Sequence, residues 1–324
     1  MFTLLAIGVA GAPLSSRAQR ENRQWRIGLV SAGTSANSSP YEDAFLAGMK
    51  EFGYAVGRNL TMDRRFAEGN PARLPALVEA VIALKPDALL GTSAGVAIAM
   101  KSKTATLPIV MCTVSDAVGT GLAKSLARPG GNITGLSLQL HELSAKHLEI
   151  AAEFLPHMRR AAVLTDASQP KMLSEGYERI ARNTAAAKGF ELAVHRVDNL
   201  GEIRKAVALM ETARADALLL NPSPRLNLLR HEICQAAMEI RLPSIGWEEV
   251  IAQAGGLVSY GPSFIEAYRR AAYYVDRIFK GVKPVDLPIE QPTKFSLVVN
   301  GKIAKALGIK IPQLILLRAE RVIE

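Results

Sequence analysis

The chain has 324 residues, of which 49% are hydrophobic, 21% charged and 6% aromatic, so it can bury a sizeable core. This composition excludes a disordered or fibrous protein. The formal net charge of +9 is scattered over short pairs such as Arg64-Arg65 and Arg269-Arg270, and this dispersion argues against a nucleic-acid partner.

The N-terminus carries the pattern of an export signal. Residues 1–12 form a short apolar run, and Ser16 and Ala18 follow at the −3 and −1 spacing of a signal-peptidase site. The run is too short to span a bilayer, and it lacks the usual basic start. We therefore predict a signal peptide over 1–18 and a periplasmic mature protein. No cysteine follows the run, so a lipoprotein anchor would have no attachment point here.

In the first half, buried-strand patterns alternate with helical patterns. The predicted elements are a strand at 27–30, a helix at 39–53, a strand at 60–66, a helix at 71–84, a strand at 87–91, a helix at 95–102, a strand at 107–112, a helix at 119–126 and a strand within 127–138. Such alternation predicts a parallel sheet with helices on both faces.

The second half repeats this order and then departs from it. The predicted elements are a helix at 142–155, a strand at 159–166, a helix at 170–188, a strand at 191–197, a helix at 201–213, a strand at 216–221, a helix at 226–240, strands at 242–247 and 256–261, a helix at 262–279, a proline-rich connector at 283–292, a strand at 294–300, a helix at 301–307 and a final apolar stretch.

Segments of the two halves correspond in kind. KPDALLGTSAG, from Lys85, matches RADALLLNPSP, from Arg214, and LPIVMCTVSDAV, from Leu107, matches LPSIGWEEVIA, from Leu242. The offset is about 130 to 136 residues throughout, a scale typical of duplicated domains. The sequence therefore predicts an α/β protein of two Rossmann-like lobes, each with a parallel sheet flanked by helices.

The turn GTSAG, Gly91 to Gly95, has the G-x-S-x-G pattern of a hydrolase nucleophile elbow with Ser93 as nucleophile. A hydrolase also needs an acid and then a histidine on a late loop, but the last histidine, His231, falls on a predicted helix. The corresponding turn of the second half, Asn221 to Pro224, suits a shared ligand cleft instead. We predict no catalytic residue and keep an α/β hydrolase using Ser93 as the alternative. No nucleotide motif or metal-ligand spacing occurs, so no cofactor or metal is predicted.

Ligands of open α/β sheets lie beyond the carboxyl ends of the strands, which here carry hydroxyls, small residues, carboxylates and aromatic rings. The predicted ligand-binding residues are Ser31, Thr34, Thr92, Ser93, Ala94, Ser115, Asp116, Asp166, Asn221, Trp247 and Tyr260.

Three kinds of contact are expected from this set. The N–H groups of Ser93 and Ala94, at a helix start, can hold a carboxylate. Trp247 or Tyr260 can stack on an apolar body, and an aspartate such as Asp116 can pair with an ammonium group. Each residue also has an ordinary structural role open to it: the hydroxyls and Asp116 as helix caps, and Trp247 as packing between the lobes.

Long motifs resemble a known family. ARPGGNITGLS at 127–137, the run from Gly256 to Gly281 and PVDLPIEQPTKFSLVVN at 284–300 are similar to the ABC transporter substrate-binding proteins of the tryptophan/tyrosine type. The resemblance covers about 26–324. It implies a type I periplasmic-binding-protein fold whose two lobes are joined by three crossovers.

The resemblance also implies boundaries and a function. Lobe 1 would comprise 25–137 plus 262–284, and lobe 2 would comprise 138–261 plus 285–324. A small organic ligand, such as an amino acid or aromatic carboxylate, would be held between the lobes and enclosed by a hinge motion. We expect a monomer that delivers this ligand to the membrane subunits of an ABC permease. A ligand sensor of the same fold remains an alternative.

Overall fold

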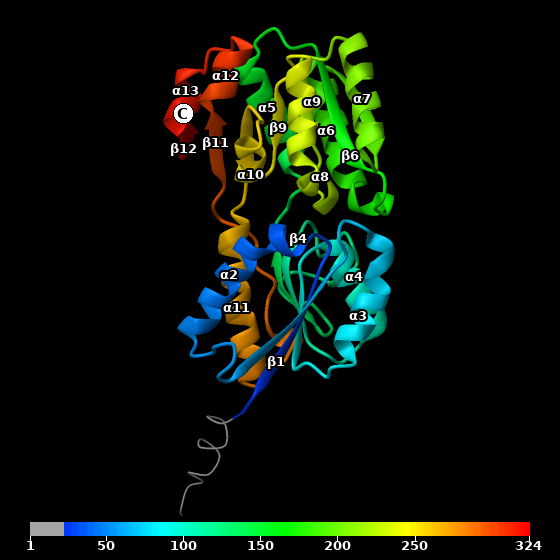
Figure 1. Ribbon diagram of the computed structural model, residues 1–324, viewed down its shortest axis with the longest axis vertical. Helices are drawn as coiled ribbons and strands as arrows, with labels where there is room; N and C mark the ends of the chain where they lie inside the picture. The colour runs from blue at the N-terminus through cyan, green and yellow to red at the C-terminus, as the bar shows by residue number, and fades with distance from the viewer. Residues whose placement is uncertain (1–22) are drawn as a thin grey trace, which may run out of the picture.

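Two sheets, one in each lobe, organise the part of the chain that the structure describes, residues 23–324 of a computed structural model (Figure 1). The predicted fold of two α/β lobes with parallel sheets is confirmed. The predicted signal peptide, 1–18, lies outside the described residues. Within 23–324, no helix is both long and apolar enough to cross a membrane.

Lobe 1 contains a five-stranded parallel sheet in the order β2-β1-β3-β4-β5. Its strands are β1 (Trp25–Ser31), β2 (Leu60–Phe66), β3 (Ala88–Gly91), β4 (Ile109–Val114) and β5 (Ile133–Ser137). Its helices are α2 (Ser35–Glu51), η1 (Pro71–Arg73), α3 (Leu74–Ile82), α4 (Ala94–Lys103), α11 (Phe264–Phe279) and η3 (Pro284–Asp286).

Helices bury both faces of this sheet. Successive strand residues point to opposite sides, so neighbouring residues of one strand contribute to different cores. Leu29 packs with Phe45 of α2 in one core cluster, whereas Val30 packs with Val78 of α3 in another. The layers are therefore α2 and α11 on one face and α3 and α4 on the other, which explains the continuous apolar strands.

Lobe 2 contains a seven-stranded sheet in the order β12-β11-β10-β9-β8-β6-β7, in which only the β10–β11 pair is antiparallel. Its strands are β6 (Arg160–Asp166), β7 (Glu191–Val197), β8 (Ala217–Leu220), β9 (Ser244–Gly246), β10 (Val258–Gly261), β11 (Ser296–Asn300) and β12 (Arg321–Ile323).

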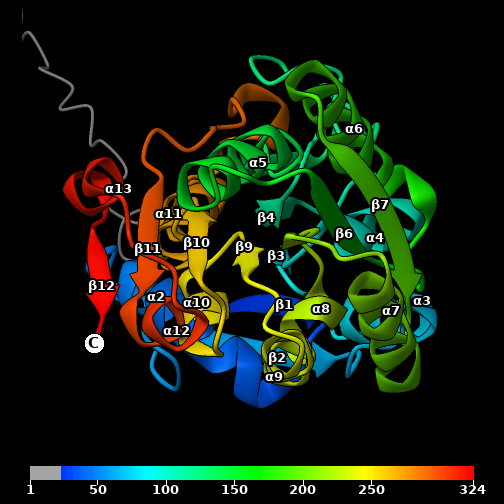
Figure 2. The same cartoon turned by 90° about the horizontal axis from the view of Figure 1, so that it is seen from above.

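Helices cover both faces of the lobe 2 sheet. They are α5 (Leu143–Phe154), η2 (Lys171–Leu173), α6 (Glu175–Lys188), α7 (Leu200–Thr212), α8 (Pro224–Leu228), α9 (Arg230–Glu239), α10 (Glu249–Gln253), α12 (Gly301–Leu307) and α13 (Gln313–Arg318). Figure 2 shows α5 and α6 on one side of the sheet and α7, α9 and α10 on the other.

Some predicted helices are wrong in position or existence. The helix predicted at 119–126 is absent: Asp116 Oδ1 accepts hydrogen bonds from the N–H groups of Val118 and Gly119, and Gly121 has φ +69°, so turns form there instead. The first helix begins at Ser35, before the predicted 39, because Thr34 Oγ1 caps it by accepting from the Asn37 N–H.

The chain passes between the lobes three times: after β5, after β10 and between η3 and β11 (Figure 1). Near the third passage, Glu290 N–H donates to Gly135 O, and Ser137 N–H donates to Glu290 O. At the second passage, a ring nitrogen of the buried His147 lies 2.8 Å from Tyr260 O. The predicted lobe boundaries at 137/138, 261/262 and 284/285 stay a prediction.

Gly135 is a sensitive position at the base of these connections. Its φ is +122°, and an added Cβ would lie 2.2 Å from Met111 O on the neighbouring strand. We expect Gly135→Ala to lower the free energy of unfolding by at least about 2 kcal/mol, seen as a lower midpoint in thermal unfolding.

Gly131→Ala is the matched control, because no atom lies within 4 Å of its added Cβ. It should change stability by less than about 0.5 kcal/mol. Equal midpoints for the two variants would contradict the steric argument.

Candidate ligand-binding cleft

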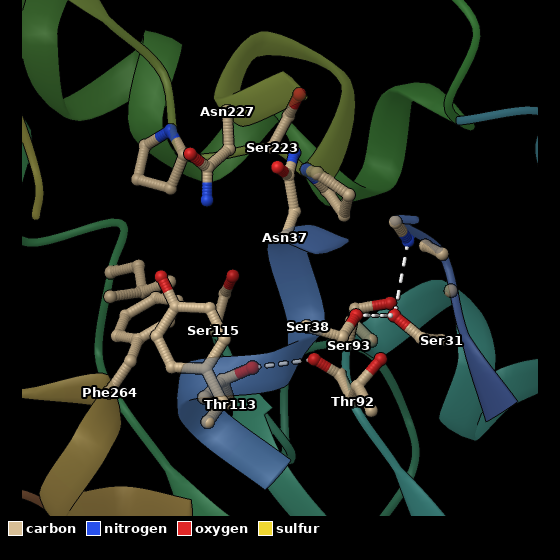
Figure 3. Close-up of a pocket in the computed structure, with 18 of the residues that line it drawn as sticks. Ser31, Asn37, Ser38, Thr92, Ser93, Thr113, Ser115, Ser223, Asn227 and Phe264 are labelled. Atoms are coloured by element: carbon tan, nitrogen blue, oxygen red, sulfur yellow. Dashed lines mark hydrogen bonds between the residues drawn. The ribbon is translucent and has the colours of Figure 1, made fainter. Parts of the chain in front are cut away.

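A cavity lies where the carboxyl ends of β1, β3 and β4 in lobe 1 face those of β8 and β9 in lobe 2 (Figure 3). It contains about 830 Å³ of atom-free space, mouth included. Its polar side chains are Ser31, Asn37, Ser38, Thr92, Ser93, Thr113, Ser115, Gln169, Ser223 and Asn227. Its apolar and aromatic side chains are Tyr41, Leu140, Leu173, Pro222, Pro224, Trp247, Phe264 and Tyr268.

The described lining contains no carboxylate, no histidine and no cationic side chain. The cavity can therefore bind a ligand through neutral dipoles and apolar contact, and no general base touches Ser93 within it. Among the residues that the structure describes, no group of three or more potential ligands is placed to hold a metal ion.

The start of α4 supplies free amide groups to the cavity wall. Ser93 is the N-cap, with extended backbone angles, and its Oγ accepts from the Val96 N–H at 3.4 Å. Ala94 and Gly95 follow as the first helical residues, whose N–H groups have no acceptor within the helix. Both residues line the cavity, so this edge favours a negatively polarised oxygen.

Hydroxyl groups brace the same edge (Figure 3). Ser31 Oγ lies 3.0 Å from Ser38 Oγ and accepts from the Gly33 N–H at 3.1 Å. Thr113 Oγ1 donates to Thr92 O at 2.5 Å, which ties the end of β4 to the end of β3. These bonds fix the polar wall of lobe 1, and Ser223 and Asn227 of lobe 2 face it across the opening.

Three aromatic residues form one end of the cavity. Tyr41 stacks on Tyr268, with ring centroids 5.4 Å apart, and packs at 6.2 Å against Phe264. Burial raises the pKa of both tyrosines above the usual value, so they stay neutral. The sequence reasoning missed all three. A signal was available for two of them. Phe264 and Tyr268 are spaced i, i+4 at the start of the helix predicted at 262–279, which places both rings on one face of that helix.

The structure brings six of the eleven predicted site residues to the cavity wall: Ser31, Thr92, Ser93, Ala94, Ser115 and Trp247. Trp247 is only 2% exposed, so most of its ring packs within the protein. That these six residues bind a ligand stays a prediction.

The other five predicted residues lie outside the lining of this cavity and have local partners: Thr34, Asp116, Asp166, Asn221 and Tyr260. Thr34 and Asp116 cap α2 and a turn, as described above. Asp166 is 3% exposed and accepts bonds from Ser168, Gln169 and Ser223.

Asn221 and Tyr260 are likewise engaged within lobe 2. Asn221 Nδ2 donates to Thr165 Oγ1 at 2.8 Å. The Tyr260 ring stacks on Phe295, with centroids 5.8 Å apart, in the segment that returns to lobe 2.

Hydrogen bonds join the lobes on both sides of the cavity. Tyr41 OH of α2 donates to Glu248 Oε1 at 2.6 Å, and Arg225 Nη2 of α8 donates to Gly69 O at 2.7 Å. Glu248 was not predicted as a site residue, although it directly follows Trp247 at the end of β9. These hydrogen bonds hold the two lobes in contact around the cavity.

The sequence profile of the ABC transporter substrate binding proteins matches residues 38–323. The chain belongs to this family. One relative is the tyrosine-binding protein of Clostridioides difficile (strain R20291). Its sequence is 23% identical to this one, and the alignment covers 96% of this chain and 92% of the relative.

Two solved structures share the fold of this substrate-binding protein. The ABC domain from Streptococcus pneumonia in complex with L-Trp is 23% identical, with a TM-score of 0.86 over 93% of this chain and 100% of that one. The ligand-free, open structure of CD0873, a substrate binding protein from Clostridium difficile, is 21% identical, with a TM-score of 0.67 over 92% and 99%.

The buried carboxyl of Glu248 predicts that the stability of this substrate-binding protein depends on pH. Burial raises its pKa to about 7, against the lowering effects of the Tyr41 hydrogen bond and the Arg230 charge; nearby Glu249 raises it slightly. A carboxyl whose pKa is higher when folded adds stability below its ordinary value of about 4.5, and that stability is lost as the pH rises through about 7. Glu248→Gln, which carries no charge, should therefore exceed the wild type in stability by about 3 kcal/mol at pH 8, and the difference should fall below about 1 kcal/mol at pH 5 and vanish only at still lower pH.

Thermal unfolding of both proteins at pH 5, 6.5 and 8 measures this difference. Glu211→Gln is the matched control, because Glu211 is exposed on α7 and is not among the residues that shift the pKa of Glu248, so this variant should follow the wild type at every pH. A pH-independent gap between wild type and Glu248→Gln would contradict the prediction.

Proposed function

We propose that this protein is the extracytoplasmic ligand-binding component of an ABC importer and that its ligand is an amino acid with an apolar or aromatic body. The observation that carries the proposal is the neutral cavity between the lobes, with free amides at one edge and aromatic rings at one end. Family membership supports the transport role, and the tyrosine and L-Trp named for two relatives support the ligand class.

The α4 edge would bind the carboxylate of the ligand. The N–H groups of Ala94 and Gly95 point out of the helix start, where the helix dipole also favours negative charge. Ser93 and Thr92 add hydroxyls beside them. An anion held this way needs no cationic side chain, which agrees with the neutral lining.

Lobe 2 would bind the amino group. Asn227 lines the cavity, and its Oδ1 is a buried acceptor without a hydrogen-bond partner. An unsatisfied buried acceptor is costly, and an ammonium N–H would satisfy it. The apolar body would lie against Phe264 and Tyr268, whose rings offer area without charge.

A hinge motion would enclose the ligand. Its carboxylate would contact lobe 1 and its amino group lobe 2, so the closed state would bind it more tightly than an open state. The bonds from Tyr41 to Glu248 and from Arg225 to Gly69 would form on closing. The higher TM-score to the L-Trp complex than to the ligand-free, open structure supports this reading of the present arrangement.

The closed surface of a monomer would then dock on the membrane subunits of the permease, outside the cytoplasm. The apolar N-terminal run, read as a signal peptide, supports export. The alternative of an α/β hydrolase is disfavoured because Ser93 Oγ is used as a helix cap and no histidine is in the described lining.

Ligand-dependent stabilisation tests the proposal. L-Trp, L-Tyr and L-Phe at 100-fold excess over Kd should stabilise the protein by about 2.7 kcal/mol, raising the thermal midpoint by several degrees. Indole-3-acetate, without an amino group, and tryptamine, without a carboxylate, should bind at least tenfold more weakly, because each loses one polar anchor.

Phe264→Ala should weaken L-Trp binding at least tenfold in calorimetry, because it removes aromatic contact area. Ile265→Ala, the next residue and 43% exposed, is its control and should bind as the wild type does. Stabilisation by sugars or metal ions alone would overturn the proposed ligand class.

Ser93→Ala separates binding from catalysis. It removes the cap of α4 and should lower stability by about 1 kcal/mol and weaken ligand binding several-fold. Ester hydrolysis should be undetectable in both proteins. An esterase activity that the wild type has and Ser93→Ala lacks would restore the hydrolase interpretation.

A further inference from the structure

A second cavity lies beside the cleft. Helices α3 and α4 of lobe 1 form one side of it, and the segment 166–173 and helix α8 of lobe 2 form the other. We call it the outer pocket. It contains about 850 Å³ of atom-free space, mouth included, comparable to the cleft itself. The apolar residues that define it are Pro71, Leu74, Ile98, Ala99, Pro170 and Leu173.

The outer pocket adjoins the cleft. Ser93, Gly95, Gln169 and Leu173 line both cavities. These residues come from both lobes, so both lobes build the boundary between the two cavities. A ligand in the cleft would therefore have a second cavity beside it at the α4 edge, on the far side of its polar anchor.

Gly95 lies in the boundary that the two cavities share. An added Cβ there would lie 3.9 Å from Leu74 Cδ1 and 3.9 Å from Leu173 Cδ1, which is ordinary contact, and Gly95 is not among the glycines with positive φ. Neither packing nor backbone conformation requires a glycine at this position. The absent side chain leaves free the gap between the two leucines of opposite lobes.

Most polar groups at the rim of the outer pocket are engaged by the protein. Asp166 accepts hydrogen bonds from Ser168, Gln169 and Ser223, and Arg225 donates to the carbonyl oxygens of Gly69 and Asp198. Arg225 Nε, 3.7 Å from Asp166 Oδ1, is buried without a hydrogen-bond partner. An apolar group in the pocket would gain hydrophobic stabilisation and one carboxylate could accept from Arg225 Nε, whereas a second carboxylate would lose its hydration without a free partner.

We propose that the outer pocket is a subsite for a second apolar group of the ligand, joined to the first through the polar centre at the α4 edge. The ligand class is an aromatic amino acid extended at its carboxyl end by an apolar group, of which an apolar dipeptide is the simplest. The α4 N–H groups can donate to a peptide carbonyl oxygen as well as to a carboxylate oxygen, although the bond to the neutral carbonyl is weaker. This inference rests on the proposed function of the cleft and adds a length preference to it.

Calorimetry with L-Phe, L-Phe-L-Leu and L-Phe-L-Asp tests the proposal on the wild-type protein. L-Phe-L-Leu should bind about tenfold more tightly than L-Phe, and L-Phe-L-Asp should bind at least tenfold more weakly than L-Phe-L-Leu. Equal affinities for L-Phe and L-Phe-L-Leu, or preference for L-Phe, would overturn the subsite while leaving the proposed function standing. Absence of binding by all three would overturn both.

Filling the outer pocket supplies the matched variants. Ala99→Leu should reduce the affinity for L-Phe-L-Leu about tenfold and leave that for L-Phe within about twofold, because Ala99 lines the outer pocket and not the cleft. Ile98→Phe, a second filling variant, should do the same.

Ala187→Leu, on an exposed part of α6, makes the same chemical change away from both cavities and should alter neither affinity. Equal losses for L-Phe and L-Phe-L-Leu in the filling variants would contradict the subsite.

Discussion

The facing edges of two parallel sheets are the constraint on which the site depends. A parallel strand ends where its following helix begins, so the sheet edge carries turn hydroxyls and unpaired amides together. The halves of this chain place such edges opposite each other, across one cavity. The hydroxyls of Ser93 and Ser223 and the amides of Ala94 and Gly95 are therefore polar groups placed by local structure, and they line one cavity only through the pairing of the lobes.

Strand ends could be predicted from sequence because apolar runs and the turn residues after them are local signals. For this reason Ser31, Thr92, Ser93 and Ser115 were selected, and the structure places them on one wall. The same reasoning also selected Asp166, whose hydrogen bonds turned out to be taken up by its own loop. A strand-end position alone does not reveal whether neighbouring N–H and O–H groups will satisfy a carboxylate first.

Other features depend on how the lobes meet, which no local pattern reveals. Tyr41 and Phe264 reach the cleft from helix faces that the arrangement of the two lobes brings there, and Glu248 contacts the cleft only through Tyr41. Likewise, the helix predicted at 119–126 had adequate apolar residues, but the turn around Asp116 and the left-handed Gly121 prevailed over that pattern. Tertiary contacts and a few special backbone positions thus account for most of the differences between the predicted and the observed elements and site residues.

The neutral lining of the cleft has a consequence for the environment in which the protein works. Mobile ions weaken attraction between exposed charges, but they have little effect on amide and hydroxyl dipoles enclosed between two lobes. Recognition by such a wall should change little between dilute and saline surroundings. The proposed ligand should therefore bind with a similar Kd at low and at high ionic strength.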